Sequence, residues 1–97
     1  MTDSQKPSYT LKFTPAALRE LEKLDLSVRR KVFSDIEKLE ENPRPHGVVK
    51  MQTKEKLYRI YVGPGTNYRV IYQTRDEALL VLVVKVGDRK DVYRGVK

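Results

Sequence analysis

Three segments of this 97-residue chain, residues 57–62, 68–74 and 79–86, alternate between apolar or aromatic side chains and other residues. A period of two is typical of a β-strand that buries one face. Each segment also carries one cation on its expected outer face: Arg59, Arg69 and Lys85. If the segments pair as neighbours, one face of the sheet packs a core. The other face then presents these cations to a ligand such as a polyphosphate.

The expected core consists of the residues that alternate with these cations along the same segments. Its members are aromatic, β-branched or leucine, which suits half-buried strands: Tyr58, Ile60, Val62, Tyr68, Val70, Tyr72, Leu80, Leu82, Val84 and Val86. Residues 63–67 contain two glycines and a proline, so we expect a β-hairpin turn there. Asp76 and Glu77 make the next tight connection, and Arg89 follows the last strand.

The first half of the chain has the residue spacing of helices. Residues 9–13 alternate and predict a short first strand. The dipeptide Thr14-Pro15 combines an N-cap residue with one that fits the first helical turn, so we expect a helix over 16–24. Residues 25–27 interrupt it, and apolar side chains three and four apart predict a second helix from residue 28 as far as Asn42-Pro43. The order predicts an α+β fold, β-α-α-β-β-β, in which a helical hairpin packs on an antiparallel sheet.

The composition bounds the class of protein. A chain of this length without a repeat or linker predicts one domain, residues 1–97, and we expect residues 1–7 to be flexible. The chain has no cysteine and one histidine, His46, so we expect no metal or other cofactor. No apolar run reaches the ~18 residues of a membrane span, and the start lacks the apolar run of a signal peptide. We therefore expect a cytoplasmic protein without a membrane partner.

Positive charge is concentrated in the strand half of the chain. The net charge is +7, and residues 1–45 hold nine Lys and Arg against eight Asp and Glu. Residues 46–97 hold eleven against five. A one-sided positive field favours phosphate-backbone binding, because each cation that neutralises a phosphate releases counterions. We expect a polyanion or an acidic protein as a partner.

Three ordered motifs together carry a family resemblance. They are Leu57-Tyr-Arg-Ile-Tyr-Val62, Asn67-Tyr-Arg-Val-Ile-Tyr72 and Val86-Gly-Asp-Arg-Lys-Asp-Val-Tyr-Arg94. The chain resembles the RelE/ParE superfamily of bacterial type II toxin–antitoxin toxins, specifically its RelE branch. The resemblance implies a RelE-like fold and a ribosome-dependent endoribonuclease that cleaves messenger RNA in the decoding site. It also implies a cognate antitoxin, which inhibits the toxin and carries the hetero-oligomer on operator DNA.

The resemblance assigns roles to the residues that match these motifs. Arg69 matches an arginine that stabilises the transition state, and Arg89 matches one that assists the leaving oxygen and holds the phosphate. Arg59 stands where relatives often have a lysine that contacts the substrate backbone. Tyr93 matches a C-terminal tyrosine that stacks on a base. Tyr61 stands where better-studied relatives carry a second lysine, proposed as the general base, so the chain departs from the family there.

Four lysines complete the expected RNA-binding set: Lys50, Lys54, Lys56 and Lys85. The three upstream lysines contact the RNA backbone or supply a substitute for the base. A phenol has an ordinary pKa of ~10, so Tyr61 is a poor base at neutral pH unless neighbouring arginines favour its phenolate form.

Two rival functions stay open. The ParE branch shares the fold but poisons DNA gyrase, and the arginines together with the C-terminal tyrosine argue against it. A non-catalytic module that binds RNA or protein through the same basic face is the second rival. Asp88 and Asp91 flank Arg89 and are expected to balance its charge. His46, between Pro45 and Gly47, is expected to be a loop residue.

Overall fold

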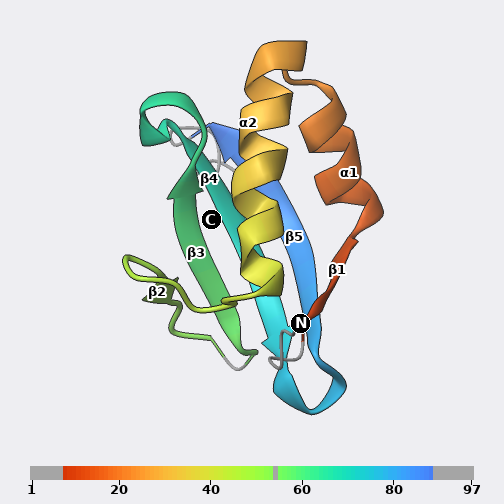
Figure 1. Cartoon of the computed structure of the whole chain (residues 1–97), viewed down its shortest axis with the longest axis vertical. Coiled ribbons are helices and arrows are strands. Elements are labelled where there is room, and N and C mark those ends of the chain that lie inside the picture. Colours follow the sequence, from red (N-terminus) through yellow and green to blue (C-terminus); the bar gives the residue numbers. More distant parts are fainter. Residues whose placement is uncertain (1–7, 54, 89–97) are drawn as a thin grey trace, which may run out of the picture.

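The structure describes residues 8–53 and 55–88, in which one sheet carries both helices on a single face (Figure 1). This computed structural model contains the strands β1 (Thr10–Phe13), β2 (Val49–Lys50), β3 (Leu57–Val62), β4 (Tyr68–Arg75) and β5 (Leu80–Asp88). Its helices are α1 (Pro15–Glu22) and α2 (Leu26–Glu37), and short 3₁₀ turns cover Lys38–Glu40, Pro64–Thr66 and Asp76–Ala78. The predicted α+β class and order of elements are confirmed, with β2 as an additional short strand.

The described strands form one mixed sheet in the order β1-β5-β4-β3-β2. β3, β4 and β5 make the predicted antiparallel meander, and β2 adds a short antiparallel edge next to β3. β1 extends the sheet at the other edge, where it lies parallel to β5 with Thr10 opposite Leu80. Parallel neighbours require a long crossover, which the helices and the first strands of the meander supply. The sequence pattern did not indicate this parallel edge.

Local sequence signals set the helix boundaries. The Thr14 hydroxyl accepts the backbone N–H three residues later at 3.1 Å, and Pro15 lies in the first turn, as predicted. α1 ends at Glu22 and α2 begins at Leu26, so both helices lie slightly earlier than expected. Among the described residues, no helix combines the length and apolar character that a bilayer crossing requires. The helices run antiparallel over the sheet (Figure 1) and bury four apolar residues: Ala17, Leu21, Val32 and Ile36.

In the first half of β5, the odd-numbered residues are buried, whereas the sequence predicted that the even-numbered ones would be. Val81 and Val83 are fully buried, whereas Leu80, Leu82 and Val84 are only half-buried, so these three core predictions were wrong. The other predicted core residues lie in the core or pack against it: Tyr58, Ile60, Val62, Tyr68, Val70, Tyr72 and Val86.

A β-bulge explains the change of parity in β5. Tyr72 lies opposite Val83, but the preceding residue of β4, Ile71, lies opposite Lys85. Val84 is therefore an extra residue in β5, and side chains beyond it point to the face opposite to the one a regular strand would give. Because of the bulge, Lys85 lies on the outer face as predicted, although the odd-numbered residues before it, Val81 and Val83, face the core.

Polar contacts close the end of the sheet where β4 meets β5. Asp76 Oδ1 accepts hydrogen bonds from the Tyr9 hydroxyl at 2.8 Å and from Arg44 Nη1 at 3.1 Å. These two donors hold the pKa of the Asp76 carboxyl below its usual range. The buried Tyr72 hydroxyl donates to the Pro43 carbonyl at 2.6 Å, so the segment after α2 is bound to the central strand.

Candidate active site

Tyr61 in β3 and Arg69 in β4 lie opposite each other. They alternate along their strands with the core residues Val62 and Val70, so both lie on the sheet face that the helices leave uncovered (Figure 1). The Arg69 guanidinium carbon is 4.8 Å from the centroid of the Tyr61 ring. Arg69 Nη2 also donates a hydrogen bond to the Tyr61 hydroxyl. The electron-rich ring face and the hydroxyl both favour the cation, so the pair has a fixed mutual geometry. It combines a permanent positive charge with a hydroxyl group.

Arg69 is buried, which corrects the prediction that all three strand cations face a ligand openly. Its exposed fraction is 3%, whereas that of Tyr61 is 38%. The Tyr61 ring lies over the guanidinium group and covers part of it. A guanidinium group with little water around it interacts more strongly with a developing negative charge than a solvated one does.

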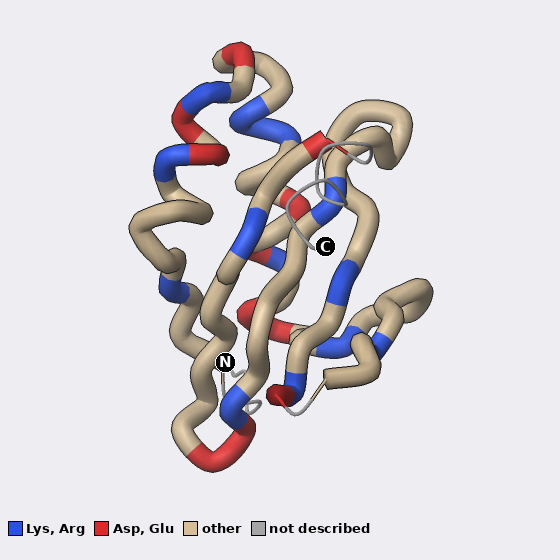
Figure 2. Tube along the Cα trace, turned by 180° about the vertical axis from the view of Figure 1, so that it is seen from behind, with Lys and Arg blue, Asp and Glu red and all other residues tan. Residues whose placement is uncertain are grey.

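A second row of side chains lies beside this pair. Arg59 in β3 is opposite Ile71 in β4, which is opposite Lys85 in β5. Directly opposed residues share a face of a sheet, so the prediction that Arg59, Arg69 and Lys85 lie on one face is confirmed. Figure 2 shows Lys and Arg positions on neighbouring strands of this face. The two rows are roughly 7 Å apart along the strands.

Lys85 forms an ion pair with a helix residue that the sequence did not identify. Its Nζ lies 3.2 Å from Glu20 Oε2, and both side chains are 30% exposed. Glu20 Oε1 accepts the Val86 backbone N–H at 2.8 Å. Glu20 lies on α1 immediately before the buried Leu21, and this position beside the apolar stripe was the available signal. Lys85 is therefore a paired cation at the margin of the site.

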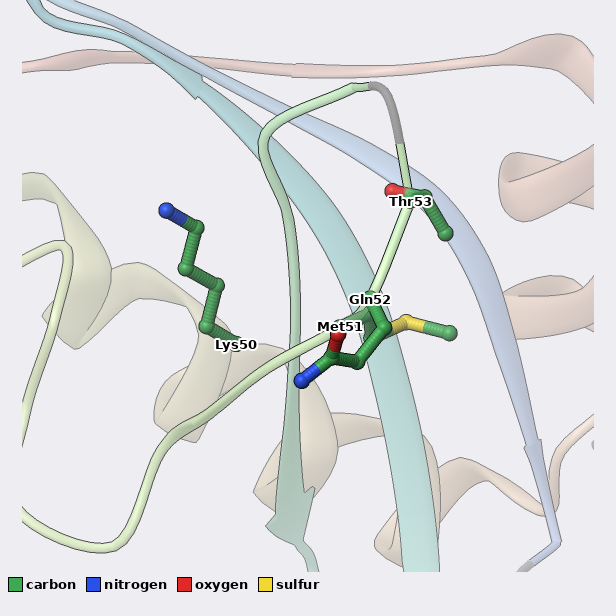
Figure 3. A pocket seen from close by; sticks show the side chains of 4 residues that line it. All are labelled: Lys50, Met51, Gln52 and Thr53. Carbon is green, nitrogen blue, oxygen red and sulfur yellow. The ribbon is translucent and has the colours of Figure 1, made fainter.

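Lys50 lies in β2 at the edge of the sheet. It is opposite Tyr58, which is buried under the helices, so the register places Lys50 on the helix side rather than beside Arg59. A hollow of about 670 Å³ opens next to it and is lined by Lys50, Met51, Gln52 and Thr53. Figure 3 shows the Lys50 side chain pointing away from those of Met51 and Thr53.

Lys56 lies at the far end of β3 from the site. It directly precedes that strand, five residues or roughly 16 Å along the chain from Tyr61. Its carbonyl accepts the Thr74 N–H at 3.4 Å, which places it beside the end of β4. The structure therefore does not bring Lys50 or Lys56 next to the Tyr61–Arg69 pair.

Three of the expected site residues lie outside the described residues: Lys54, Arg89 and Tyr93. The ranges 8–53 and 55–88 contain no group of three or more His, Cys, Asp or Glu side chains placed to hold a metal ion. The Tyr61–Arg69 pair and the row beside it offer the chemistry of arginine, lysine and tyrosine. Such groups can bind a phosphate, stabilise negative charge and move a proton at a hydroxyl.

Comparison with known proteins identifies the family. A family model described as the ParE toxin of the type II toxin–antitoxin system parDE matches residues 11–93. The chain belongs to this toxin family, within the RelE/ParE superfamily. It is 33% identical over 88 residues to the mRNA interferase toxin RelE of Escherichia coli, a match that covers 89% of this chain and 90% of that protein. The resemblance predicted from the three motifs is confirmed.

Solved structures of RelE toxins have the same fold. The isolated E. coli RelE toxin superimposes with a TM-score of 0.72 at 32% identity, covering 91% of this chain and 94% of that one. The toxin in the intact E. coli RelBE toxin–antitoxin complex gives a TM-score of 0.69 at 32% identity, covering 84% and 96%. The fold of this ParE-family chain is therefore that of RelE.

Proposed function

We propose that this chain is the toxin of a type II toxin–antitoxin system and acts as a ribosome-dependent endoribonuclease on messenger RNA. The observation that carries the proposal is the buried Arg69 guanidinium group held 4.8 Å from the ring of its cross-strand neighbour Tyr61. The similarity to a protein named mRNA interferase toxin RelE supports the same reaction. The proposal accounts for a guanidinium group kept close to a hydroxyl in a site with little water.

The proposed reaction is a phosphoryl transfer within the RNA. The ribose 2′-oxygen forms a bond to the adjacent phosphorus, and the bond from phosphorus to the 5′-oxygen breaks. The 2′-hydroxyl gives its proton to a base, and the leaving 5′-oxygen receives one, so the products are a cyclic phosphate and a 5′-hydroxyl. Negative charge gathers on the phosphoryl oxygens in the transition state, and a preorganised guanidinium group stabilises it.

Each described site residue has a proposed role in this reaction. Arg69 stabilises the charge on the phosphoryl oxygens. Arg59, one row along the same face, binds the RNA backbone. The Tyr61 hydroxyl acts as the base or positions the 2′-hydroxyl. Arg89 and Tyr93 are assigned from their motif alone, to the leaving oxygen and to base stacking respectively.

The remaining lysines have peripheral roles in the proposal. Lys50, Lys54 and Lys56 bind RNA backbone away from the reacting phosphate, which fits the positions of Lys50 and Lys56 at the sheet edge and the far end of β3. Lys85 binds RNA only after exchanging its contact with Glu20 for a phosphate. None of these lysines replaces Tyr61 as the base in this scheme.

The proposed partners follow from charge and from the relatives. The net charge of +7 favours ribosomal and messenger RNA. The structure of the intact E. coli RelBE complex supports a cognate antitoxin for this chain. The antitoxin would inhibit the toxin and would carry the complex on operator DNA.

A gyrase poison is the second candidate, because the matching family model is described as a ParE toxin. Primer extension on a translated message after induction separates the two functions. We expect breaks inside codons, in register with the reading frame, with normal plasmid supercoiling. Intact messages together with trapped gyrase–DNA complexes would assign the chain to gyrase poisoning instead.

Matched arginine variants sharpen this experiment. Arg69→Lys keeps the charge but loses the planar, forked donor, so breaks should disappear while the protein stays folded. Arg75 lies exposed at the end of the same strand. Arg75→Lys should retain the wild-type pattern of breaks. Wild-type breaks in the Arg69→Lys variant would refute the assigned role of Arg69.

A further inference from the structure

Two carboxylates, one from each helix, accept backbone N–H groups of the sheet. Glu20 on α1 accepts from Val86 in β5, with 2.8 Å between Oε1 and the nitrogen. Asp35 on α2 accepts from Gly63, at the end of β3, with 2.9 Å between Oδ2 and the nitrogen. A hydrogen bond to an ionised acceptor is stronger than one between neutral groups. Each helix therefore has one strong point of attachment to the strands, in addition to apolar packing.

These attachments lie on both sides of Arg69. The cross-strand neighbours of Arg69 are Tyr61 in β3 and Gly87 in β5. Gly63 is two residues after Tyr61, and Val86 is the residue immediately before Gly87. The two carboxylates thus fix the backbone next to each neighbour of Arg69, on the two strands that flank it.

Each attachment point lies where part of the strand pairing has ended, although Val86 still pairs with Val70 of β4. Pairing of β1 with β5 ends at Val83, so Val86 lies on a stretch of β5 without that neighbour. On the other strand, Gly63 leads into the 3₁₀ turn Pro64–Thr66 and has φ of +81°, where the ladder of β3 and β4 ends. A buried or half-buried N–H group without a partner is costly, so the carboxylates both satisfy the backbone and fix its path.

Neighbouring lysines keep both carboxylates in place. Asp35 Oδ1 lies 3.3 Å from Lys31 Nζ and 3.5 Å from Lys38 Nζ, and the Asp35 side chain is 17% exposed. Burial acts to raise the pKa of Asp35, but the Gly63 N–H and the two lysines outweigh it and hold that pKa below its usual range. Glu20 has the corresponding contact with Lys85 at 3.2 Å. Both acceptors are thus held by cations as well as by backbone.

We infer that Glu20 and Asp35 are positioning residues that hold Tyr61 and Arg69 in their productive mutual geometry. Neither carboxylate touches the pair; both act through the backbone of the flanking strands. The catalytic consequence rests on the proposed function, whereas the geometric consequence does not. A displacement of about 1 Å between reacting groups lowers a rate by roughly 10²-fold, so a small movement of these strands should be measurable.

The test compares alanine, amide and control variants of the full chain. Glu20→Ala and Asp35→Ala remove the acceptors. Glu20→Gln and Asp35→Asn keep an oxygen that can accept the same N–H. Glu22→Ala and Glu37→Ala are matched controls, because each removes an exposed carboxylate two residues further along the same helix. The readouts are the NMR signals of the Tyr61 ring, assigned with Tyr61→Phe, and single-turnover cleavage on programmed ribosomes.

We expect both acceptor-to-alanine variants to shift the Tyr61 ring signals and to slow cleavage by roughly 10-fold or more. The half-saturating ribosome concentration should stay within about 2-fold, because binding is not the affected step. The amide variants should keep the ring signals and stay within about 3-fold of the wild-type rate. The controls should match wild type in both readouts.

Ring signals that stay at their wild-type positions in Glu20→Ala and Asp35→Ala would overturn the inference. Amide variants as slow as the alanine variants would also overturn it, because charge rather than the backbone hydrogen bond would then be responsible. If an alanine variant does not fold, the test is the hydrogen-exchange rate of the Gly63 or Val86 backbone N–H in the corresponding amide variant. Slow exchange together with a wild-type cleavage rate supports the inference. Fast exchange together with a wild-type cleavage rate refutes it. If wild type cleaves no message on ribosomes, the proposed function fails, but the ring signals still test the geometry.

Discussion

Gly63 should accept no side chain, and Gly63→Ala is the most informative stability variant of this fold. Its φ of +81° and ψ of −175° lie in a backbone region that only glycine populates readily. A Cβ at this position would also lie 2.9 Å from Val32 Cγ2 on α2 and 3.0 Å from Tyr68 Cδ1 on β4. The variant therefore combines backbone strain with a clash between the turn and two core residues.

The expected magnitude follows from these two effects. Backbone strain of this kind costs about 1–3 kcal/mol. Overpacking a filled core costs about 1–3 kcal/mol more, because Val32 is fully buried. The free energy of unfolding should fall by about 2–6 kcal/mol, which is a large part of the stability of a small domain. At about 4–8 °C per kcal/mol, the melting temperature should fall by at least about 8 °C.

Gly47→Ala is the matched control for this prediction. Gly47 also has a positive φ, +91°, but a Cβ there would meet no atom within 4 Å. Its cost should be limited to backbone strain, about 1–2 kcal/mol. Urea and thermal unfolding of both purified variants measure the difference. Equal losses of stability in Gly63→Ala and Gly47→Ala would refute the steric part of the reasoning, and an unchanged melting temperature in Gly63→Ala would refute all of it.

Three further predictions concern the site and its supports. Arg69→Ala should lower single-turnover cleavage by roughly 10²–10³-fold, because it removes a transition-state donor; wild-type toxicity of the folded variant would contradict this. Tyr61→Phe keeps the ring over Arg69 but loses the hydroxyl, so cleavage should slow far more than ribosome binding weakens; an unchanged rate would exclude Tyr61 as base. Asp35 has a pKa below 3.8 in the folded state, so its ionised form stabilises above about pH 4 and that contribution is lost as pH falls through the folded pKa. The stability difference between wild type and Asp35→Asn should therefore shrink from about pH 6 to about pH 3 in urea titrations, and a constant difference would refute it.

The faces of β3 and β4 could be predicted from the sequence because both strands are regular. The alternation places Arg59 and Arg69 on the outer face, and the structure agrees. The same reasoning failed in β5, whose residues 79–84 are apolar on both parities and so do not indicate a face. The bulge at Val84 then shifted the parity within the strand. A bulge depends on pairing with neighbouring strands, so the sequence of one strand does not reveal it.

The sequence offered Tyr61 and Arg69 as candidates, but it did not indicate the burial of Arg69 or the contacts of Glu20 and Asp35. The turn length brings Tyr61 opposite Arg69, and a hairpin prediction contains that information. The contact between the Tyr61 ring and the Arg69 guanidinium group joins two strands, so the periodicity of either strand does not encode it. Glu20 meets its backbone partner 66 positions away along the chain, and Asp35 meets its partner 28 positions away. Both acids look like ordinary surface residues of amphipathic helices when read locally.

The two faces of the sheet carry different parts of the proposed site. On the helix face, Glu20 and Asp35 supply negative charge to backbone N–H groups at the ends of β5 and β3. On the other face, Arg59 and Arg69 are the cations that the proposed reaction assigns to the phosphate. The two carboxylates act on the backbone of the strands that flank β4, next to Tyr61 and Gly87, the cross-strand neighbours of Arg69. Loss of either carboxylate should therefore change the position of a neighbour of Arg69 without removing any group that the proposal places on the substrate.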